Sequence, residues 1–222
     1  KVSGLSLSYT FNLMLATLFA LTATMSFSIG YQLTKKKIGG VLTAFLVTLA
    51  GNMQTIYAFT KGYTGEDVKP FWTLLWSFSE FFSRVGEGMQ TYWYANATRF
   101  IPFTIHEFPS YSFVVSDVHG HVLSLPFVLL ALALLITMSL RSASWRRSNL
   151  AQFIFYGFLL GVLLMTNALD GPIYGLLFVV LIVVNAKSWK QTLPVIGYVA
   201  LIALVTALPF LFYFNSFATG IG

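Results

Sequence analysis

The sequence predicts an all-α integral membrane protein that crosses the bilayer about six times. Of its 222 residues, 57% are hydrophobic and only 9% are charged, whereas a water-soluble chain of this length needs more polar residues to cover its outside. The apolar residues also gather in runs close to the ~20 residues that a helix needs to cross the hydrocarbon core. Finally, the basic residues concentrate in short loops between these runs, as they do in membrane proteins.

Six apolar runs are candidate transmembrane helices, and we expect them to form one transmembrane domain covering residues 1–222. The fifth run is short, so it could be tilted, re-entrant or longer at its ends. Because the chain starts without Met and without a signal-peptide pattern, we expect an internal or trimmed piece of a longer protein. The six predicted spans are approximately 9–33, 38–60, 121–140, 150–166, 172–184 and 193–214.

The placement of charge predicts the orientation of the chain. Eight of the 13 Lys and Arg residues stand in the loops 35–37, 141–147 and 187–190, which follow the first, third and fifth spans. The positive-inside rule makes this face of the cell membrane cytoplasmic. All seven acids and all three histidines then fall on the extracytoplasmic face, together with the long segment 61–120. The net charge of +6 therefore reflects orientation, and we expect no nucleic-acid partner.

The long outer segment contains a predicted surface helix. In 71–82, aromatic residues recur at helical spacing with Ser and Glu between them. This pattern is typical of an amphipathic helix that lies in the membrane interface. A helix packed beneath a loop fits the same pattern equally well.

The densest polar stretch, 99–121, leads directly into the third predicted span. Asp117, His119 and His121 occupy alternate positions, so all three share a face in an extended segment, whereas a helix groups only Asp117 with His121. Such groups are costly beside lipid unless they are paired, bind a ligand or face a cavity. The pattern fits a divalent-cation site, a phosphate or sugar site, or an acid-capped helix start.

A second polar stretch, 166–172, forms the predicted turn between the fourth and fifth spans. Asn167, Asp170 and Pro172 are residues that favour turns and helix starts. Asp170 could therefore be a structural cap. It is also a candidate site residue, because the predicted topology places it on the same face as Asp117.

Three segments resemble motifs of the YYY family of multi-span membrane proteins from bacteria and archaea. The longest reads A-T-R-x-I-P-x-T-I-x-E-F-P through S-D-x-H-x-H-x-L-S-L-P-F over residues 97–127. The others are 11–31, which ends in Gly-Tyr, and 163–174, which contains T-N-x-x-D-x-P. Two residues depart from the family pattern: Gly120 replaces a Pro between the histidines, and Leu169 replaces a Trp.

This family is similar to the GT-C glycosyltransferases, so the resemblance implies a GT-C-like fold with an outer interfacial helix. It implies transfer of a sugar from a polyprenyl-phosphate donor on the extracytoplasmic face. The implied catalytic residues are Asp117, His119, His121 and Asp170. The implied substrate-binding residues are Arg99, Glu107, His106 and Asn167. Asp117 and His119 are also candidate ligands of a divalent cation such as Mg²⁺ or Mn²⁺, and longer family members carry an acidic upstream stretch that could hold the base.

The alternative function is a non-enzymatic structural subunit of a larger membrane complex, with the aromatic outer segment as its interface. A transporter ranks third, because no acid or histidine lies in the middle of a predicted span, where ion-coupled carriers usually place one. Under every hypothesis the expected surroundings are membrane lipid, with other membrane proteins as candidate partners.

Overall fold

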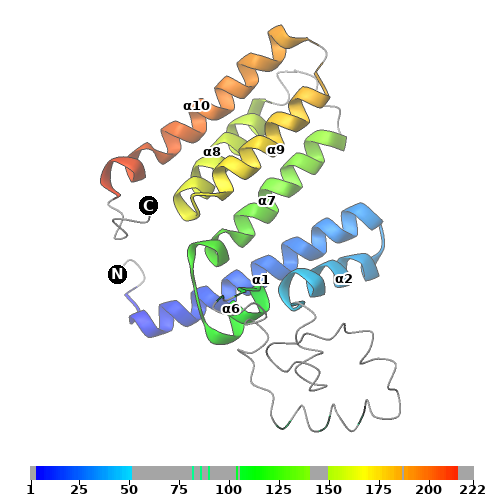
Figure 1. Cartoon of the computed structure of the whole chain (residues 1–222), viewed down its shortest axis with the longest axis vertical. Coiled ribbons are helices and arrows are strands. Elements are labelled where there is room, and N and C mark those ends of the chain that lie inside the picture. Colours follow the sequence, from blue (N-terminus) through cyan, green and yellow to red (C-terminus); the bar gives the residue numbers. More distant parts are fainter. Residues whose placement is uncertain are drawn as a thin grey trace. The chain divides into compact units, whose positions relative to one another are not determined.

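The computed structural model describes residues 4–51, 82, 86, 90, 104, 106–140, 150–186 and 188–214. Within these residues the chain is all-helical, with seven helices and no strand (Figure 1). The all-α prediction is thereby confirmed. The chain divides into two compact units, Lys1–Val118 and His119–Gly222.

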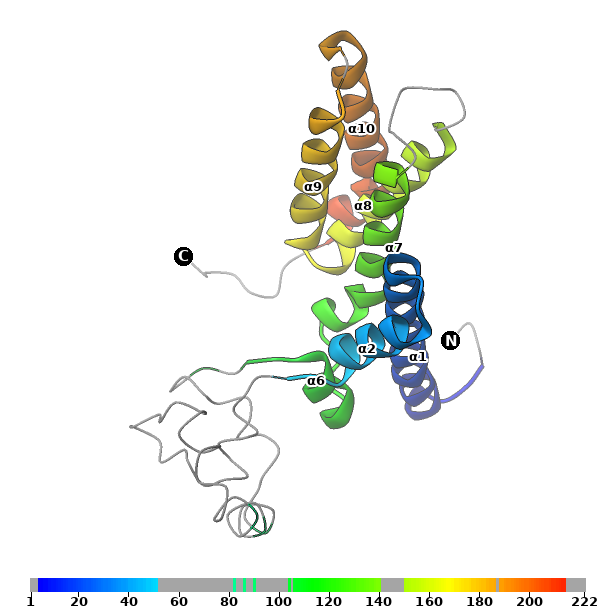
Figure 2. The same ribbon diagram turned by 90° about the vertical axis from the view of Figure 1, so that its right-hand side faces the viewer.

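The first unit is built on a helical hairpin of α1 (Leu7–Thr34) and α2 (Lys37–Thr48) (Figure 2). Lys35 ends α1 in the left-handed region, with φ 58°, and its N–H donates to the carbonyl oxygen of Tyr31 at 2.7 Å. This is a common way to close a helix. Because only two residues separate the helices, they return antiparallel to each other.

Small and polar side chains form the contact between α1 and α2. The buried residues of α1 recur at every fourth position and are Leu18, Thr22, Ser26 and Gly30. A Cβ added at Gly30 would lie 2.6 Å from the Cβ of Thr43 and 2.7 Å from the carbonyl oxygen of Gly39. The two backbones are therefore closer than side chains would allow, which is the usual way for helices to associate in lipid.

A short helix, α6 (Pro109–Val115), completes the described part of this unit. It starts with Pro109, whose fixed φ and missing N–H suit the first helical position. Phe113 of α6 packs edge-on against Phe19 of α1, with ring centroids 5.1 Å apart.

The second unit is a bundle of four helices: α7 (Gly120–Leu140), α8 (Leu150–Thr166), α9 (Asp170–Val184) and α10 (Trp189–Tyr213). The central helix is α8, which contacts the other three. One face of α8 packs tightly on α10. A Cβ added at Gly157 or Gly161 would come within 2.9 Å or 2.7 Å of a carbonyl oxygen of α10.

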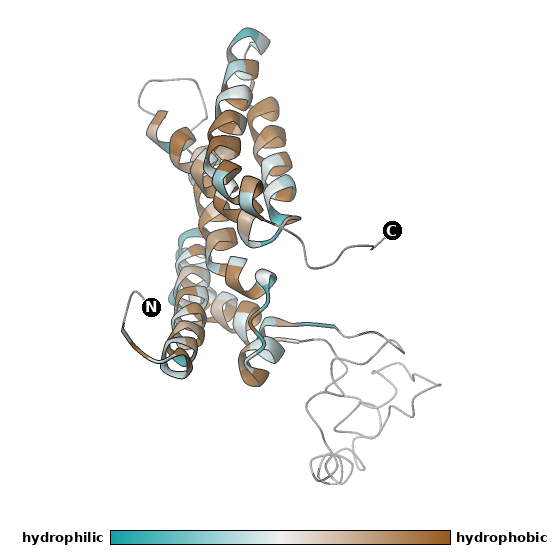
Figure 3. Ribbon diagram, turned by 90° about the vertical axis from the view of Figure 1, so that its left-hand side faces the viewer, coloured by the Kyte–Doolittle hydropathy of each residue, from teal (hydrophilic) through white to brown (hydrophobic). Residues whose placement is uncertain are grey.

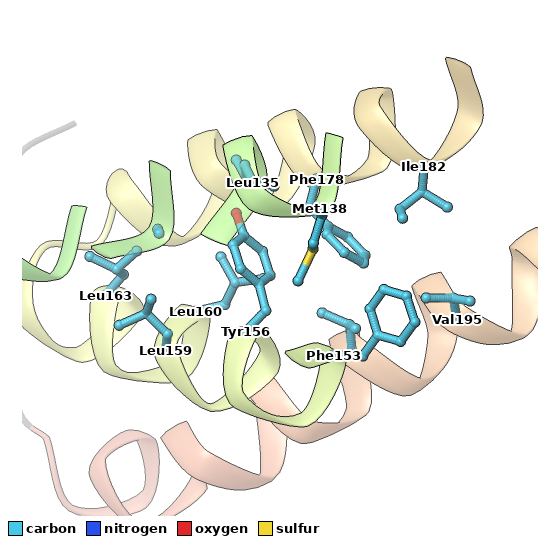
Figure 4. Close-up of a cluster of buried hydrophobic side chains, with 12 residues drawn as sticks. Leu135, Met138, Phe153, Tyr156, Leu159, Leu160, Leu163, Phe178, Ile182 and Val195 are labelled. Carbon is cyan, nitrogen blue, oxygen red and sulfur yellow. The ribbon is translucent and has the colours of Figure 1, made fainter. Parts of the chain in front are cut away.

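An adjoining side of α8 carries the hydrophobic core of this bundle (Figure 4). Phe153 and Tyr156 of α8 pack on Phe178 of α9 with ring centroids 6.2 Å and 5.0 Å away. Leu135 and Met138 from α7 close the core over these rings. Three helices thus interlock through large side chains.

Six helices correspond in order to the six predicted spans, and hydrophobic residues run along the helices of both units (Figure 3). By length and composition, three described helices can cross a membrane: Leu7–Thr34, Gly120–Leu140 and Thr192–Tyr213. The others are apolar but shorter: Lys37–Thr48, Leu150–Thr166 and Asp170–Val184. The number of crossings therefore stays a prediction, as does the single transmembrane domain.

Several predicted features lie outside the described residues. They include Arg99, most of the surface helix 71–82, the basic loop 141–147 and the second half of the span 38–60. Within the described residues, the helix of that second span ends at Thr48.

Candidate functional site

The candidate residues of the first unit flank the short helix α6. Glu107 is exposed, and the half-buried His106 has its Nε2 3.5 Å from the hydroxyl of Thr104. At the other end, Ser116 adopts the left-handed region with φ 58°, and its N–H donates to the carbonyl oxygen of Ser112. The N–H of Asp117 donates to the same oxygen at 2.9 Å. Asp117 thus completes the end of α6.

The two histidines of the second unit stand at the start of α7. The carbonyl oxygen of His119 accepts the N–H groups of Val122 and Leu123 at 3.0 Å and 3.1 Å, so His119 is the residue from which the helix starts. His119 is exposed and His121 is half-buried. Their ring centroids are 5.7 Å apart and the rings are tilted by 44°. The structure therefore brings these two predicted site residues together.

Asp170 is the first residue of α9. Two hydrogen bonds close the turn before it. The N–H of Asn167 donates to the carbonyl oxygen of Leu163 at 2.8 Å, and the N–H of Asp170 donates to the carbonyl oxygen of Asn167 at 3.0 Å. The capping position belongs to Leu169, and no side-chain cap is formed there. A negative charge in the first turn is still favourable, because it faces the positive end of the helix dipole.

One oxygen of the Asp170 carboxylate needs a further explanation. Its Oδ2 is buried and has no hydrogen-bond partner within the described residues. A buried carboxylate oxygen without a partner is costly. In native proteins such atoms often mark a place where an ion, a water or a substrate binds.

Gly120 joins these two groups of residues. A Cβ added at Gly120 would overlap the carbonyl oxygen of Thr166 and would lie 4.0 Å from the Cα of Asn167. The start of α7 therefore lies directly on the turn between α8 and α9. Only glycine permits so close an approach between backbones. The segment with both histidines and the turn with Asn167 and Asp170 consequently form one polar cluster at one end of the bundle.

This cluster can act on protons, cations or anions. The imidazoles of His119 and His121 can ligate a divalent cation or, when protonated, attract a phosphate. Asn167 and Asp170 add amide and carboxylate oxygens on the adjacent turn. The pairing of Asp117 with His119 as metal ligands stays a prediction, since Asp117 belongs to the first unit and His119 to the second.

Sequence reasoning did not identify what holds this cluster in place. In the sequence, Gly120 stands out only as a departure from a motif, although a glycine between two histidines at the start of an apolar run is a usable signal of close packing. Tyr156 was not singled out. It is the polar aromatic residue in the middle of α8, and its hydroxyl donates to the carbonyl oxygen of Tyr174 at 2.8 Å.

Comparison with known proteins gives one match. The model of a protein family described as "Uncharacterized membrane protein (DUF2298)" matches residues 1–222. Among curated proteins and among solved structures, nothing matches the chain. The membrane class inferred from composition thus agrees with an independent finding.

Proposed function

We propose that this chain, which belongs over its whole length to the DUF2298 family of uncharacterized membrane proteins, is a multi-span membrane glycosyltransferase. It transfers a sugar from a polyprenyl-phosphate donor to an acceptor hydroxyl on the extracytoplasmic face. The observation that carries the proposal is the packing of Gly120 on Thr166, which places two histidines beside the turn of Asp170. The motif resemblance to the YYY family and to GT-C enzymes supports the reaction class.

The proposed topology has six crossings and places the polar cluster at one membrane surface. The 17 residues of α8 and the 15 of α9 extend about 25 Å and 22 Å at 1.5 Å per residue. These lengths approach the ~30 Å hydrocarbon core, and local thinning of the bilayer accommodates such differences. Lys190 lies at the end of the bundle opposite to the cluster, because α9 runs from Asp170 towards it. The positive-inside rule then makes the cluster extracytoplasmic.

The proposed reaction assigns complementary roles to the acid and the imidazoles. The acceptor hydroxyl loses its proton to the carboxylate of Asp170, and its oxygen forms a bond to the anomeric carbon. The bond from that carbon to the phosphate oxygen breaks, and the lipid phosphate leaves. Protonated His119 or His121 neutralises the charge on this phosphate. A Mg²⁺ or Mn²⁺ ion held by Asp117 and His119 would supply the same stabilisation.

Four further residues are proposed to bind the substrate in the complete site. They are Arg99, His106, Glu107 and Asn167. Arg99 is the candidate for a bidentate contact with phosphate, which suits a guanidinium group.

Transfer of a labelled sugar from a polyprenyl-phosphate donor tests the proposal in the full-length protein, reconstituted in liposomes. We expect the double variant Asp117→Ala, His119→Ala to lose at least ~100-fold of the activity, because it removes both proposed metal ligands and one of the imidazoles that neutralise the leaving phosphate. Asn167→Ala should lose part of it. Its matched control is Asn185→Ala at the other end of α9, which should retain full activity. Full activity of the double variant would overturn the assignment.

The alternative function, a structural subunit, predicts a different result for the same variants. A structural subunit of a membrane complex predicts a stable partner that co-purifies with the wild type and with the double variant alike. It also predicts no sugar transfer by the wild type. Measuring sugar transfer and co-purifying partners for the wild type and the double variant therefore distinguishes the two functions.

A further inference from the structure

We propose that Tyr156 is a positioning residue for the site: its hydroxyl holds the first turns of α9, and with them Asp170, against α8. The inference rests on the proposed function in one respect, namely that Asp170 takes part in the reaction. Its structural basis is the hydrogen bond from the Tyr156 hydroxyl to the carbonyl oxygen of Tyr174, 2.8 Å long.

The surroundings of Tyr156 fix the direction of its hydroxyl. Its side chain is 0% exposed, and its ring stacks on Phe178 with centroids 5.0 Å apart and planes inclined by 23°. The ring therefore cannot swing towards lipid or water, and a buried hydroxyl must find its partner nearby. Figure 4 shows the oxygen of Tyr156 pointing away from α8. The partner that it finds is the backbone of α9.

The acceptor is suited to hold a helix without disturbing it. A helical carbonyl oxygen has two lone pairs, and the N–H four residues later occupies one of them. The hydroxyl of Tyr156 can take the other, so α9 loses none of its own hydrogen bonds. Tyr174 is also one helical turn after Asp170, about 6 Å along the axis. The fixed point is thus close to the carboxylate.

A second contact joins the start of α9 to the end of α8. A Cβ added at Gly171 would lie 3.0 Å from the Cβ of Leu164, so the first turn of α9 already touches the last turn of α8. The packing of Phe178 in the core attaches α9 to α8 further along the helix. The bond from Tyr156 to Tyr174 adds a directional polar attachment between these two contacts, one turn after Asp170. Because Thr166 of α8 also holds Gly120, α8 then sets the position of Asp170 relative to both histidines.

The test uses Tyr156→Phe, which removes one oxygen and keeps the ring. The matched control is Tyr198→Phe, the same change at an exposed position of α10. Since the chain contains no cysteine, cysteines for spin labels can replace Ile154 on α8 and Ile173 on α9, which are both exposed. Electron paramagnetic resonance then gives the distribution of distances between these helices, in full-length protein with any cysteine outside these 222 residues replaced by Ser. Sugar transfer is measured on the same variants without labels.

We expect Tyr156→Phe to broaden the distance distribution and to lower kcat about tenfold, because small displacements of reacting groups are costly. KM should stay within about twofold, and Tyr198→Phe should change neither readout. If Tyr156→Phe leaves the distance distribution unchanged, the inference is overturned, whatever the activity of the variant. If the distribution broadens but kcat is unchanged, the position that Tyr156 gives to α9 does not matter for the reaction, and the proposed role of Tyr156 in the site is wrong. If the wild type transfers no sugar, the proposed function fails, and the distance distribution alone decides whether Tyr156 positions α9.

Discussion

The two units hold their helices together by different means. In the described part of the first unit, Leu18 is the only buried hydrophobic side chain, and the contacts of α1 run through Thr22, Ser26 and Gly30. In the second unit, the core includes buried aromatic rings at Phe153 and Phe178. One unit relies on closely approaching backbones, and the other adds interlocking large side chains.

This difference shows where each kind of packing is useful. Lipid removes most of the hydrophobic driving force between helices, so association depends on close packing and hydrogen bonds. Backbone contacts make a tight pair of helices, as in the α1–α2 hairpin. Interlocked large side chains fix three helices at once, and the second unit places its polar cluster at the end of such a bundle. A site needs this rigidity in its supporting elements.

The largest expected effect on stability comes from disrupting the close backbone contact between α1 and α2 in the first unit. Gly30→Leu forces a side chain into Thr43 and the backbone at Gly39, so we expect a loss of about 3 kcal/mol or more in the free energy of unfolding. Reversible unfolding in mixed micelles measures it. The control is Gly197→Leu on α10, where a Cβ meets nothing within 4 Å. Equal stability of both variants would contradict the importance of this contact.

A smaller effect is expected in the aromatic core of the second unit. Phe178→Ala leaves a cavity between Phe153 and Tyr156, which should cost about 2–3 kcal/mol. The expected loss is at or below the usual range for Phe→Ala in the cores of soluble proteins. The reason is that helices which separate within a membrane expose their apolar side chains to lipid and not to water. The same micelle titration applies, with Phe158→Ala at an exposed position of α8 as the control. A loss below that of the control would show that the rings do not hold the bundle.

The third prediction concerns the contact on which the site depends. Gly120→Ala places a methyl group on the carbonyl oxygen of Thr166. We expect about 1–2 kcal/mol of destabilisation and a clear loss of sugar transfer. Gly175→Ala is the comparison, because its Cβ would make an ordinary contact 4.0 Å from Leu160. Wild-type transfer by Gly120→Ala would mean that the histidines and Asp170 need not be held together.

The smallest expected effect on stability concerns Ser26 in the first unit. The Oγ of Ser26 is buried and has no hydrogen-bond partner among the described residues. Ser26→Ala should therefore change stability by less than about 0.5 kcal/mol or raise it slightly. Differential scanning fluorimetry in detergent, with Thr22→Ala alongside, checks this. A large loss would reveal a partner for this hydroxyl.

The helices could largely be predicted from the sequence, because apolar runs report local structure. The run 150–166 coincides with α8, and 121–140 begins one residue after α7 does. The run 38–60 was a poorer guide, since the described helix of this span ends at Thr48. Its apolar residues continue beyond Thr48, and periodicity alone does not mark the end of a helix.

The candidate site could be predicted only in part. The polar residues were visible in the sequence, and Asp170 lies within two residues of the predicted start of the fifth span, although it is the first helical residue and not the cap. The contact between Gly120 and Thr166 was not predictable, because it joins residues 46 positions apart through the packing of α7 on α8. The role proposed for Tyr156 has the same origin. Such contacts depend on which helix faces point at each other, and a single sequence does not show this.

The glycine face of α8 also has a consequence for biogenesis. Gly157 and Gly161 pack against α10, but α10 is synthesised roughly forty residues after them. At about 5–20 residues per second, this face stays uncovered for roughly 2–8 s while the chain enters the bilayer. During that interval another nascent helix with small residues could occupy it. The tight contact between α8 and α10 therefore forms only after α10 has been synthesised.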